Sequence, residues 1–143
     1  MTMKILLPVD GSDCSLRAVD HLLTHIAWFR DVPEIHLLHV HAPIPIGRVQ
    51  AHIGPETLHQ YYLEESQSHL QAAQDRLNSV GCLYSTHVHV GQPAEVIAKV
   101  GDELDCDLIV MGSHGRTGLA GMLMGSVASR VLHSAKCPVL LVK

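Results

Sequence analysis

Apolar residues recur along this chain in two patterns that take turns. One is a short run, which is continuous in most cases and alternates with polar residues at 83–90; the other is a longer stripe with a spacing of three or four. Each run predicts a β-strand, at residues 3–9, 35–40, 83–90, 106–111 and 139–142. The first, fourth and fifth runs are nearly continuous, as in strands that are covered on both faces of a sheet. Each stripe predicts an amphipathic helix between two of these strands.

The predicted helices have recognisable boundaries and buried faces. The first, over residues 14–30, carries Leu16, Val19, Leu23, Ile26 and Ala27. An irregular loop at 42–55, rich in Pro and Gly, leads to a long helix that carries Leu63, Ser66, Leu70, Ala73, Leu77 and Val80 and stops at Gly81. Pro93 opens the third helix, which carries Ala94, Ile97, Ala98 and Gly101. The fourth covers residues 125–135.

Strands that alternate with helices predict a parallel sheet with right-handed crossovers. We therefore expect residues 1–143 to form a single α/β domain, a Rossmann-like, doubly wound sheet of five parallel strands with helices on both faces. A chain of 143 residues is long enough for one such domain and its core.

Composition narrows the function classes. Hydrophobic residues make up 47% of the chain and charged residues 17%, which argues against disorder. The net charge of −4, without a basic run, argues against nonspecific nucleic-acid binding. No stretch approaches the roughly 20 apolar residues of a membrane span, and four cysteines occur singly. We expect a cytoplasmic protein with reduced thiols that binds neither nucleic acid nor membrane.

Three segments are expected to meet beyond the carboxyl ends of the strands, where open α/β sheets bind ligands. They are residues 9–12, 40–42 and 112–126. The third contains five glycines and enters the last helix at Gly125, where free N–H groups and the helix dipole favour an anion. Ser126 adds a hydroxyl donor and Arg116 a positive charge, so the segment predicts a phosphate cradle. The alternative is a glycine-rich loop without a ligand. The segment is neither a Walker A loop nor a GxGxxG fingerprint.

Motifs along nearly the whole chain resemble the universal stress protein family, in its ATP-binding branch. They are the opening at 4–12, the pattern Gly112-x2-Gly115-x9-Gly125-Ser126 after a strand that ends at 108–111, and the close at 137–142. The resemblance implies a fold like that of the adenine nucleotide alpha hydrolases. It also implies ATP, ADP or AMP as the ligand, a role in the stress response, and a homodimer. Family members that do not bind nucleotide lack the three glycines, which this chain retains.

The resemblance also assigns roles to residues. Asp10 is expected on the ribose or adenosine side, and Val40 in the adenine pocket. Phosphates are expected at the three glycines and Ser126, with Arg116 and Val127 beside them. The complete expected site is Pro8, Val9, Asp10, Val40, Met111, Gly112, Gly115, Arg116, Gly125, Ser126 and Val127. A Mg²⁺ or Mn²⁺ ion could bridge the phosphates, and no residue is assigned as catalytic or as a metal ligand.

Twelve histidines raise a separate metal hypothesis. His39 and His41 share one face of their strand, as do His87 and His89, so four imidazoles could converge if the strands are neighbours. The less specific reading, which we favour, is separate polar residues near the sheet ends. His114, inside the glycine segment, is expected near the ligand rather than in catalysis.

Three function classes are considered, and the glycines argue against one of them, an adaptor that binds no ligand. The favoured one is a dimeric module that holds ATP, its subunits joined through the strand at 139–142. The other is an enzyme, either a slow ATPase or an adenylating enzyme. Residues 10–15 faintly resemble the SGGxDS loop of ATP pyrophosphatases but lack its paired glycines. A fast ATPase would also need a phosphate-binding lysine and a base for the attacking water, and neither is evident.

Overall fold

A computed structural model describes residues 2–44, 54–115 and 124–143 of the chain. Its strands are β1 (Lys4–Pro8), β2 (Glu34–His41), β3 (Tyr84–Val90), β4 (Leu108–Gly112) and β5 (Val139–Val142). Its helices are α1 (Asp13–Thr24), a short 3₁₀ helix η1 (Ile26–Trp28), α3 (Pro55–Ser79), α4 (Pro93–Glu103) and α5 (Ser126–Ser134). The strands form one sheet in the order β3-β2-β1-β4-β5, and all neighbouring pairs are parallel. The predicted fold class is confirmed.

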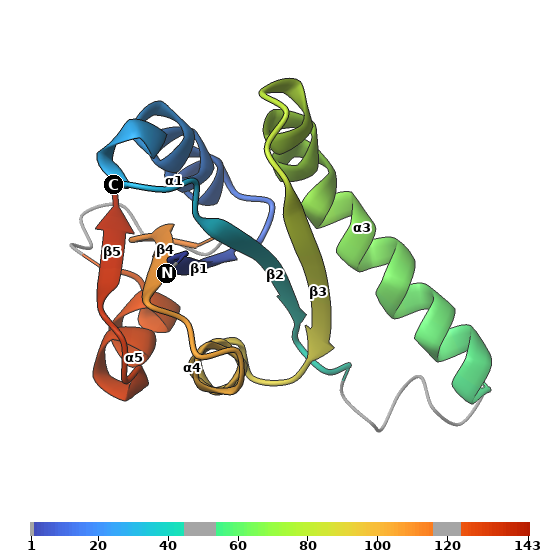
Figure 1. Cartoon of the computed structure of the whole chain (residues 1–143). Helices are drawn as coiled ribbons and strands as arrows, with labels where there is room; N and C mark the ends of the chain where they lie inside the picture. The colour runs from blue at the N-terminus through green and yellow to red at the C-terminus, as the bar shows by residue number, and fades with distance from the viewer. Residues whose placement is uncertain (1, 45–53, 116–123) are drawn as a thin grey trace.

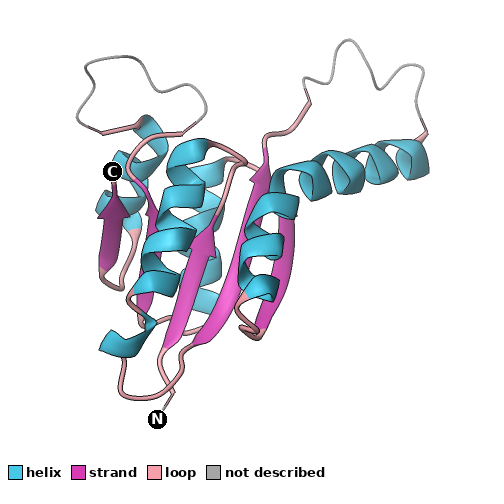
Figure 2. Ribbon diagram, turned by 90° about the horizontal axis from the view of Figure 1, so that it is seen from above, coloured by secondary structure: helices cyan, strands magenta, loops and turns pink. Residues whose placement is uncertain are grey.

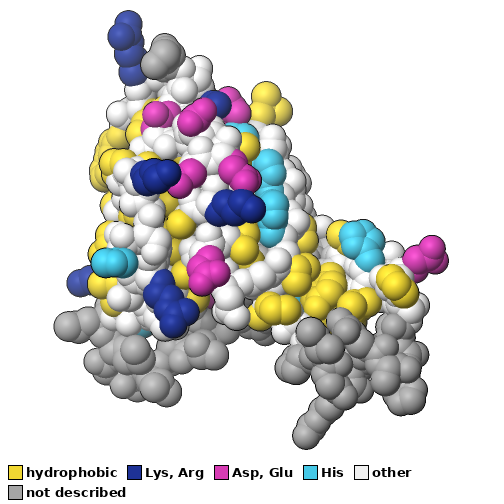
Figure 3. Space-filling model, turned by 90° about the horizontal axis from the view of Figure 1, so that it is seen from below, with side chains coloured by type: hydrophobic (Ala, Val, Ile, Leu, Met, Phe, Trp, Pro, Cys, Tyr) yellow, Lys and Arg dark blue, Asp and Glu magenta, His cyan; other side chains and the backbone are white. Residues whose placement is uncertain are grey.

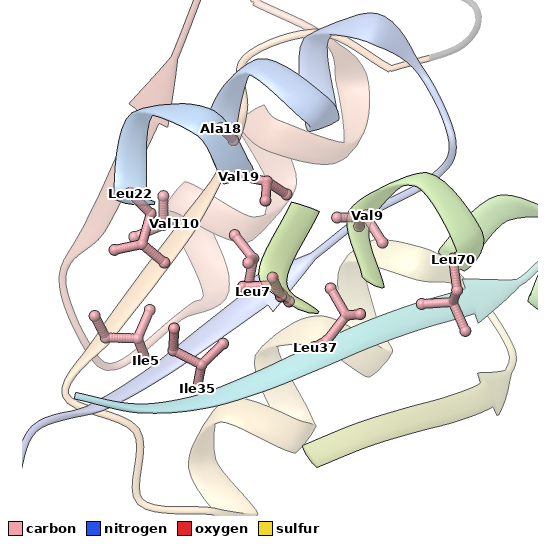
Figure 4. Close-up of a cluster of buried hydrophobic side chains, with 12 residues drawn as sticks. Ile5, Leu7, Val9, Ala18, Val19, Leu22, Ile35, Leu37, Leu70 and Val110 are labelled. Carbon is pink, nitrogen blue, oxygen red and sulfur yellow. The ribbon is translucent and has the colours of Figure 1, made fainter. Parts of the chain in front are cut away.

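Helices cover the sheet on both faces, and each face has its own core (Figure 2). On one face α1 and α3 pack on β1 and β2 through Leu7, Val19, Leu37 and Leu70 (Figure 4). On the other, α4 and α5 pack through a cluster that contains Leu6, Leu38, Ile97, Ile109 and Val131. Continuous apolar strands are needed because alternate side chains of β1, β2 and β4 enter different cores.

Two predicted helices differ from the structure. The first α-helix ends at Thr24 rather than near residue 30, because the His25 backbone N–H and Nδ1 both meet the carbonyl of His21 and close the last turn. Its buried face is Cys14, Ser15, Ala18, Val19 and Leu22, shifted from the predicted stripe. In α3, Leu63 is exposed, since the amino-terminal half of this helix projects beyond the sheet (Figure 1). Val80, predicted on the same buried stripe, follows the last residue of α3 as its C-cap and is also exposed.

The strand order places a switch between β1 and β4, from which the chain winds outward in opposite directions. The connections after β1 and β4 therefore part above and below the sheet, and the space between them is the expected ligand position. Among the described residues, no helix is long and apolar enough to cross a membrane.

Candidate functional site

A hollow of about 120 Å³ lies at the switch point, at the carboxyl ends of β1 and β4. Eight of the predicted site residues line it, namely Pro8, Val9, Asp10, Val40, Met111, Gly112, Gly115 and Val127. Most of the lining is apolar, so the hollow suits a flat, weakly polar group, with polar groups confined to its rim.

The turn after β1 fixes the carboxylate of Asp10. Its Oδ1 accepts a hydrogen bond from the Ser12 N–H at 2.9 Å, and the hydroxyl of Ser12 in turn caps α1 by accepting from the Ser15 N–H. Gly11 allows this turn because its φ of +81° lies in the left-handed region. A carboxylate held in this way can accept hydrogen bonds from hydroxyl groups of a ligand.

At the carboxyl end of β4, neighbouring atoms lie so close to the backbone that two positions require glycine. A Cβ on Gly112 would lie 2.9 Å from the backbone carbonyl carbon of Cys14 in the first turn of α1. A Cβ on Gly115 would lie 2.9 Å from Oδ2 of Asp10. The bare backbone at 112–115 therefore lies directly against both α1 and the Asp10 carboxylate, and leaves its surface open to the hollow.

The start of α5 supplies the anion-binding element. Gly125 is its N-cap and has no side chain to satisfy the first-turn N–H groups; its own N–H donates to the Ser113 carbonyl at 2.7 Å. The N–H groups of Ser126, Val127 and the next residue thus remain at the positive end of the helix dipole. Gly125 and Ser126 lie beside the hollow rather than in its lining.

Some residues fall outside these expectations or outside the described chain. Arg116 and the rest of 116–123 lie beyond the described residues. His114, which was expected near the ligand, lines the hollow, and its Nδ1 lies 2.9 Å from the Ser113 hydroxyl oxygen. The sequence reasoning missed five lining residues, namely Ser15, Leu38, Pro93, Ile97 and Ala128. Leu38 could have been found, because it shares a strand face with Val40.

The four-histidine convergence is wrong. In the parallel register, His39 pairs with Val88, whereas His87 pairs with Leu38 and His89 with Val40. Paired residues share a face, so the two histidine pairs point to opposite sides of the sheet. His39 packs instead beside His69 of α3, with ring centroids 5.0 Å apart.

Comparison with known proteins identifies the family. The model of the universal stress protein family matches residues 1–143. The chain belongs to this family. It is 38% identical to Universal stress protein MJ0531 of Methanocaldococcus jannaschii over 98% of this chain and 81% of that protein. It is 28% identical to Universal stress protein MJ0577 of the same organism over 100% of this chain and 96% of that protein.

Solved structures agree with the fold. The structure of MJ0577, reported as a structure-based assignment of biochemical function, superposes with a TM-score of 0.84 at 33% identity and covers 100% of this chain and 96% of that one. A universal stress protein in complex with cAMP superposes with a TM-score of 0.70 at 26% identity, over 99% of this chain and 97% of that one.

Proposed function

We propose that this universal stress protein binds an adenine nucleotide, ATP in particular, in the hollow at the switch point, and holds it rather than turning it over rapidly. The observation that carries the proposal is the approach of Gly115 to Asp10, which leaves bare backbone facing a fixed carboxylate across the mouth of the hollow. The complex of a 26% identical family member with cAMP supports an adenine ligand.

The chemistry of the rim sets the orientation of the nucleotide. The Asp10 carboxylate repels phosphate and accepts O–H donors, which favours the ribose hydroxyls on its side. The adenine ring then lies on the apolar wall that includes Val40 and Met111. The phosphates extend toward the amino end of α5, where the dipole and the free N–H groups stabilise negative charge.

A Mg²⁺ or Mn²⁺ ion would take most of its ligands from the phosphates and water. Asp10 is the one carboxylate among the described residues that line the hollow, and one of its oxygens already accepts the Ser12 N–H. Hard divalent cations prefer several oxygen ligands, so the ion would depend on the nucleotide for its binding.

The proposal includes a homodimer joined through β5. This strand lies at the edge of the sheet, and Leu140 on it is 38% exposed. An edge strand with apolar side chains and unpaired backbone groups favours pairing with a second copy, and a two-fold contact of this kind closes at two subunits.

Two measurements test the nucleotide assignment. Gently purified protein is denatured and the released small molecules are separated by chromatography against adenine nucleotide standards. Titration calorimetry of nucleotide-free protein then compares ATP, ADP, AMP and cAMP in the presence of Mg²⁺. We expect bound or binding adenine nucleotide; a protein that releases none and shows no heat of binding up to 1 mM ligand, about the weakest useful affinity, contradicts the proposal.

A further inference from the structure

Two histidines on neighbouring strands point ring nitrogens at one another on the α4 side of the sheet. Nδ1 of His36 on β2 lies 3.0 Å from Nε2 of His87 on the edge strand β3. His36 is 6% exposed and His87 is half-buried, so the pair is shielded from one side and open on the other. Neither residue lines the nucleotide hollow. Figure 3 shows histidine side chains gathered along one side of this face of the molecule.

A carboxylate fixes the tautomer of the inner ring. Nε2 of His36 lies 2.8 Å from Oε1 of Glu34, and since an ionised carboxylate only accepts, Nε2 must carry the proton. The lone pair of His36 is therefore on Nδ1 and is directed at His87. Protein metal sites orient a histidine ligand in the same way. A carboxylate accepts the N–H of one ring nitrogen, and the other nitrogen faces the metal.

We propose that His36 and His87 bind a divalent transition-metal ion of the Zn²⁺ or Cu²⁺ type, with Glu34 as the positioning residue. Imidazole nitrogen suits these metals. Two nitrogens at zinc bonds of about 2.0–2.1 Å in a tetrahedral site lie roughly 3.3 Å apart. The observed separation of 3.0 Å needs to open by only a few tenths of an ångström. Both rings must also turn, so that their lone pairs meet at the ion instead of lying along the line between the two nitrogens.

Metal and proton compete for the same place. Without metal, Nε2–H of His87 donates to Nδ1 of His36. When the ion binds, both nitrogens donate their lone pairs to it, and the proton of His87 moves to its Nδ1. Both rings stay neutral, Glu34 keeps its hydrogen bond to His36, and no proton is released.

The site is open rather than closed. Among the residues that the structure describes, no group of three or more His, Cys, Asp or Glu side chains could hold a metal ion. The part of the chain that the structure describes thus offers two ligands, and water or an incoming ligand fills the remaining positions. A site with two imidazoles and open positions has micromolar rather than nanomolar affinity and is not needed for folding, unlike closed four-ligand zinc sites.

Calorimetric titration of nucleotide-free protein with Zn²⁺ at pH 7.5 tests the proposal. Because the chain has twelve histidines, the matched control is His133→Ala, which removes an exposed histidine of α5. We expect wild type and His133→Ala to bind one Zn²⁺ with equal affinity, and His87→Ala to bind it at least about tenfold more weakly. Glu34→Ala, which keeps both ligands, should weaken binding about 10- to 100-fold.

The position of the ion gives an independent readout. In crystals soaked with Zn²⁺, an anomalous difference peak should lie between Nδ1 of His36 and Nε2 of His87. Circular dichroism checks that each variant is folded. The His87→Ala variant is the decisive one, because His87 is only half-buried and its replacement leaves the core intact. Equal Zn²⁺ affinity in wild type and His87→Ala, absence of binding to wild type, or a peak at other residues would overturn the proposal.

Discussion

Gly115 lies so close to Asp10 that a Cβ on the glycine would come within 2.9 Å of the carboxylate oxygen Oδ2. That oxygen cannot simply turn away, because the other oxygen of the same carboxylate accepts the Ser12 N–H at 2.9 Å. The end of β4 and the turn after β1 are thereby held together at the mouth of the hollow, although about 100 residues separate them in the sequence.

A side chain at this position should abolish nucleotide binding. In Gly115→Val the new branched side chain would displace the Asp10 carboxylate and fill the place of the ligand, so ATP affinity should fall more than about tenfold, which is ~1.4 kcal/mol. Titration calorimetry with ATP and Mg²⁺ measures the change. Gly54→Ala is the matched control, since a Cβ on Gly54 has no atom within 4 Å. Equal ATP affinity in wild type and Gly115→Val would refute the site.

Gly112 should matter for stability. A Cβ added at this position would lie 2.9 Å from the backbone carbonyl carbon of Cys14, which cannot rotate away as a side chain can. Gly112→Ala should therefore destabilise the fold by about 1–3 kcal/mol through overpacking. Gly101→Ala in α4 should instead stabilise it by roughly 0.5–1 kcal/mol, because a helix interior favours Ala and the nearest atom is at an ordinary 3.5 Å. Urea denaturation measures both, and a Gly112→Ala protein as stable as wild type would contradict the packing argument.

Acid should destabilise the protein through His39. Nδ1–H of this buried ring donates to the Val9 carbonyl at 2.8 Å, and Nε2 has no hydrogen-bond partner among the described residues. Burial lowers the pKa of His39, helped by neighbouring His69 and His41 and opposed by the Val9 hydrogen bond and by Asp10. The unfolded chain then binds more protons below about pH 6.5, so stability falls as pH falls through that range, by at most ~1.4 kcal/mol per unit for one group.

Denaturant titrations at pH 7.5 and 5.5 check this sign. His39→Asn lacks the titrating ring, so its loss of stability between the two pH values should be smaller than that of wild type. The pKa of His87 is also lowered by burial, and its contribution remains in both proteins. If both lose stability equally, His39 is not responsible for the acid sensitivity.

Much of the fold could be predicted from the sequence, because parallel strands buried on both faces leave continuous apolar runs. β5 has the predicted bounds, β1, β2 and β3 differ from prediction by one residue at one or both ends, and β4 begins two residues later than predicted. Helix spacing was less informative. Leu63 fits the apolar stripe of α3 but is exposed, because this part of the helix projects past the sheet. The local sequence pattern does not show where such a projection begins.

The candidate site was predictable as far as it depends on chain order. Asp10, Val40 and Gly112 lie at or just after the carboxyl ends of strands that must meet, and all three line the hollow. Side-chain direction across strands was not predictable, since it depends on register. His39 pairs with Val88 rather than with His87, so the pair His39 and His41 and the pair His87 and His89 lie on opposite faces of the sheet. The same register brings His36 and His87 together.

Hydrolysis of ATP should be slow. Among the described residues that line the hollow there is no lysine, and Asp10, the one carboxylate, is already hydrogen-bonded. We expect no more than about one turnover per minute, below the usual enzyme range of ~1–10³ per second. A phosphate-release assay that shows many turnovers per second, lost in Asp10→Ala, would instead establish an ATPase.

The proposed dimer depends on one backbone edge. The carbonyls of Pro138 and Val142 accept from the N–H groups of Ile109 and Ser113, so the even-numbered residues of β5 bond toward β4. In a parallel ladder the alternate residues then face the other way, and the N–H of Leu141 points to the open edge. Leu141→Pro removes this donor without breaking the ladder to β4.

Leu141→Pro should therefore convert a dimer into a monomer, whereas Leu141→Ala, which loses the side chain but keeps the N–H, should remain dimeric. Light scattering on a size-exclusion column at tens of micromolar, a concentration that separates weak from stable association, measures the mass of each protein. Circular dichroism shows whether the proline variant stays folded. A monomeric wild type, or a folded Leu141→Pro protein that still dimerises, would exclude pairing through β5, because antiparallel strand addition needs the outward N–H that proline lacks.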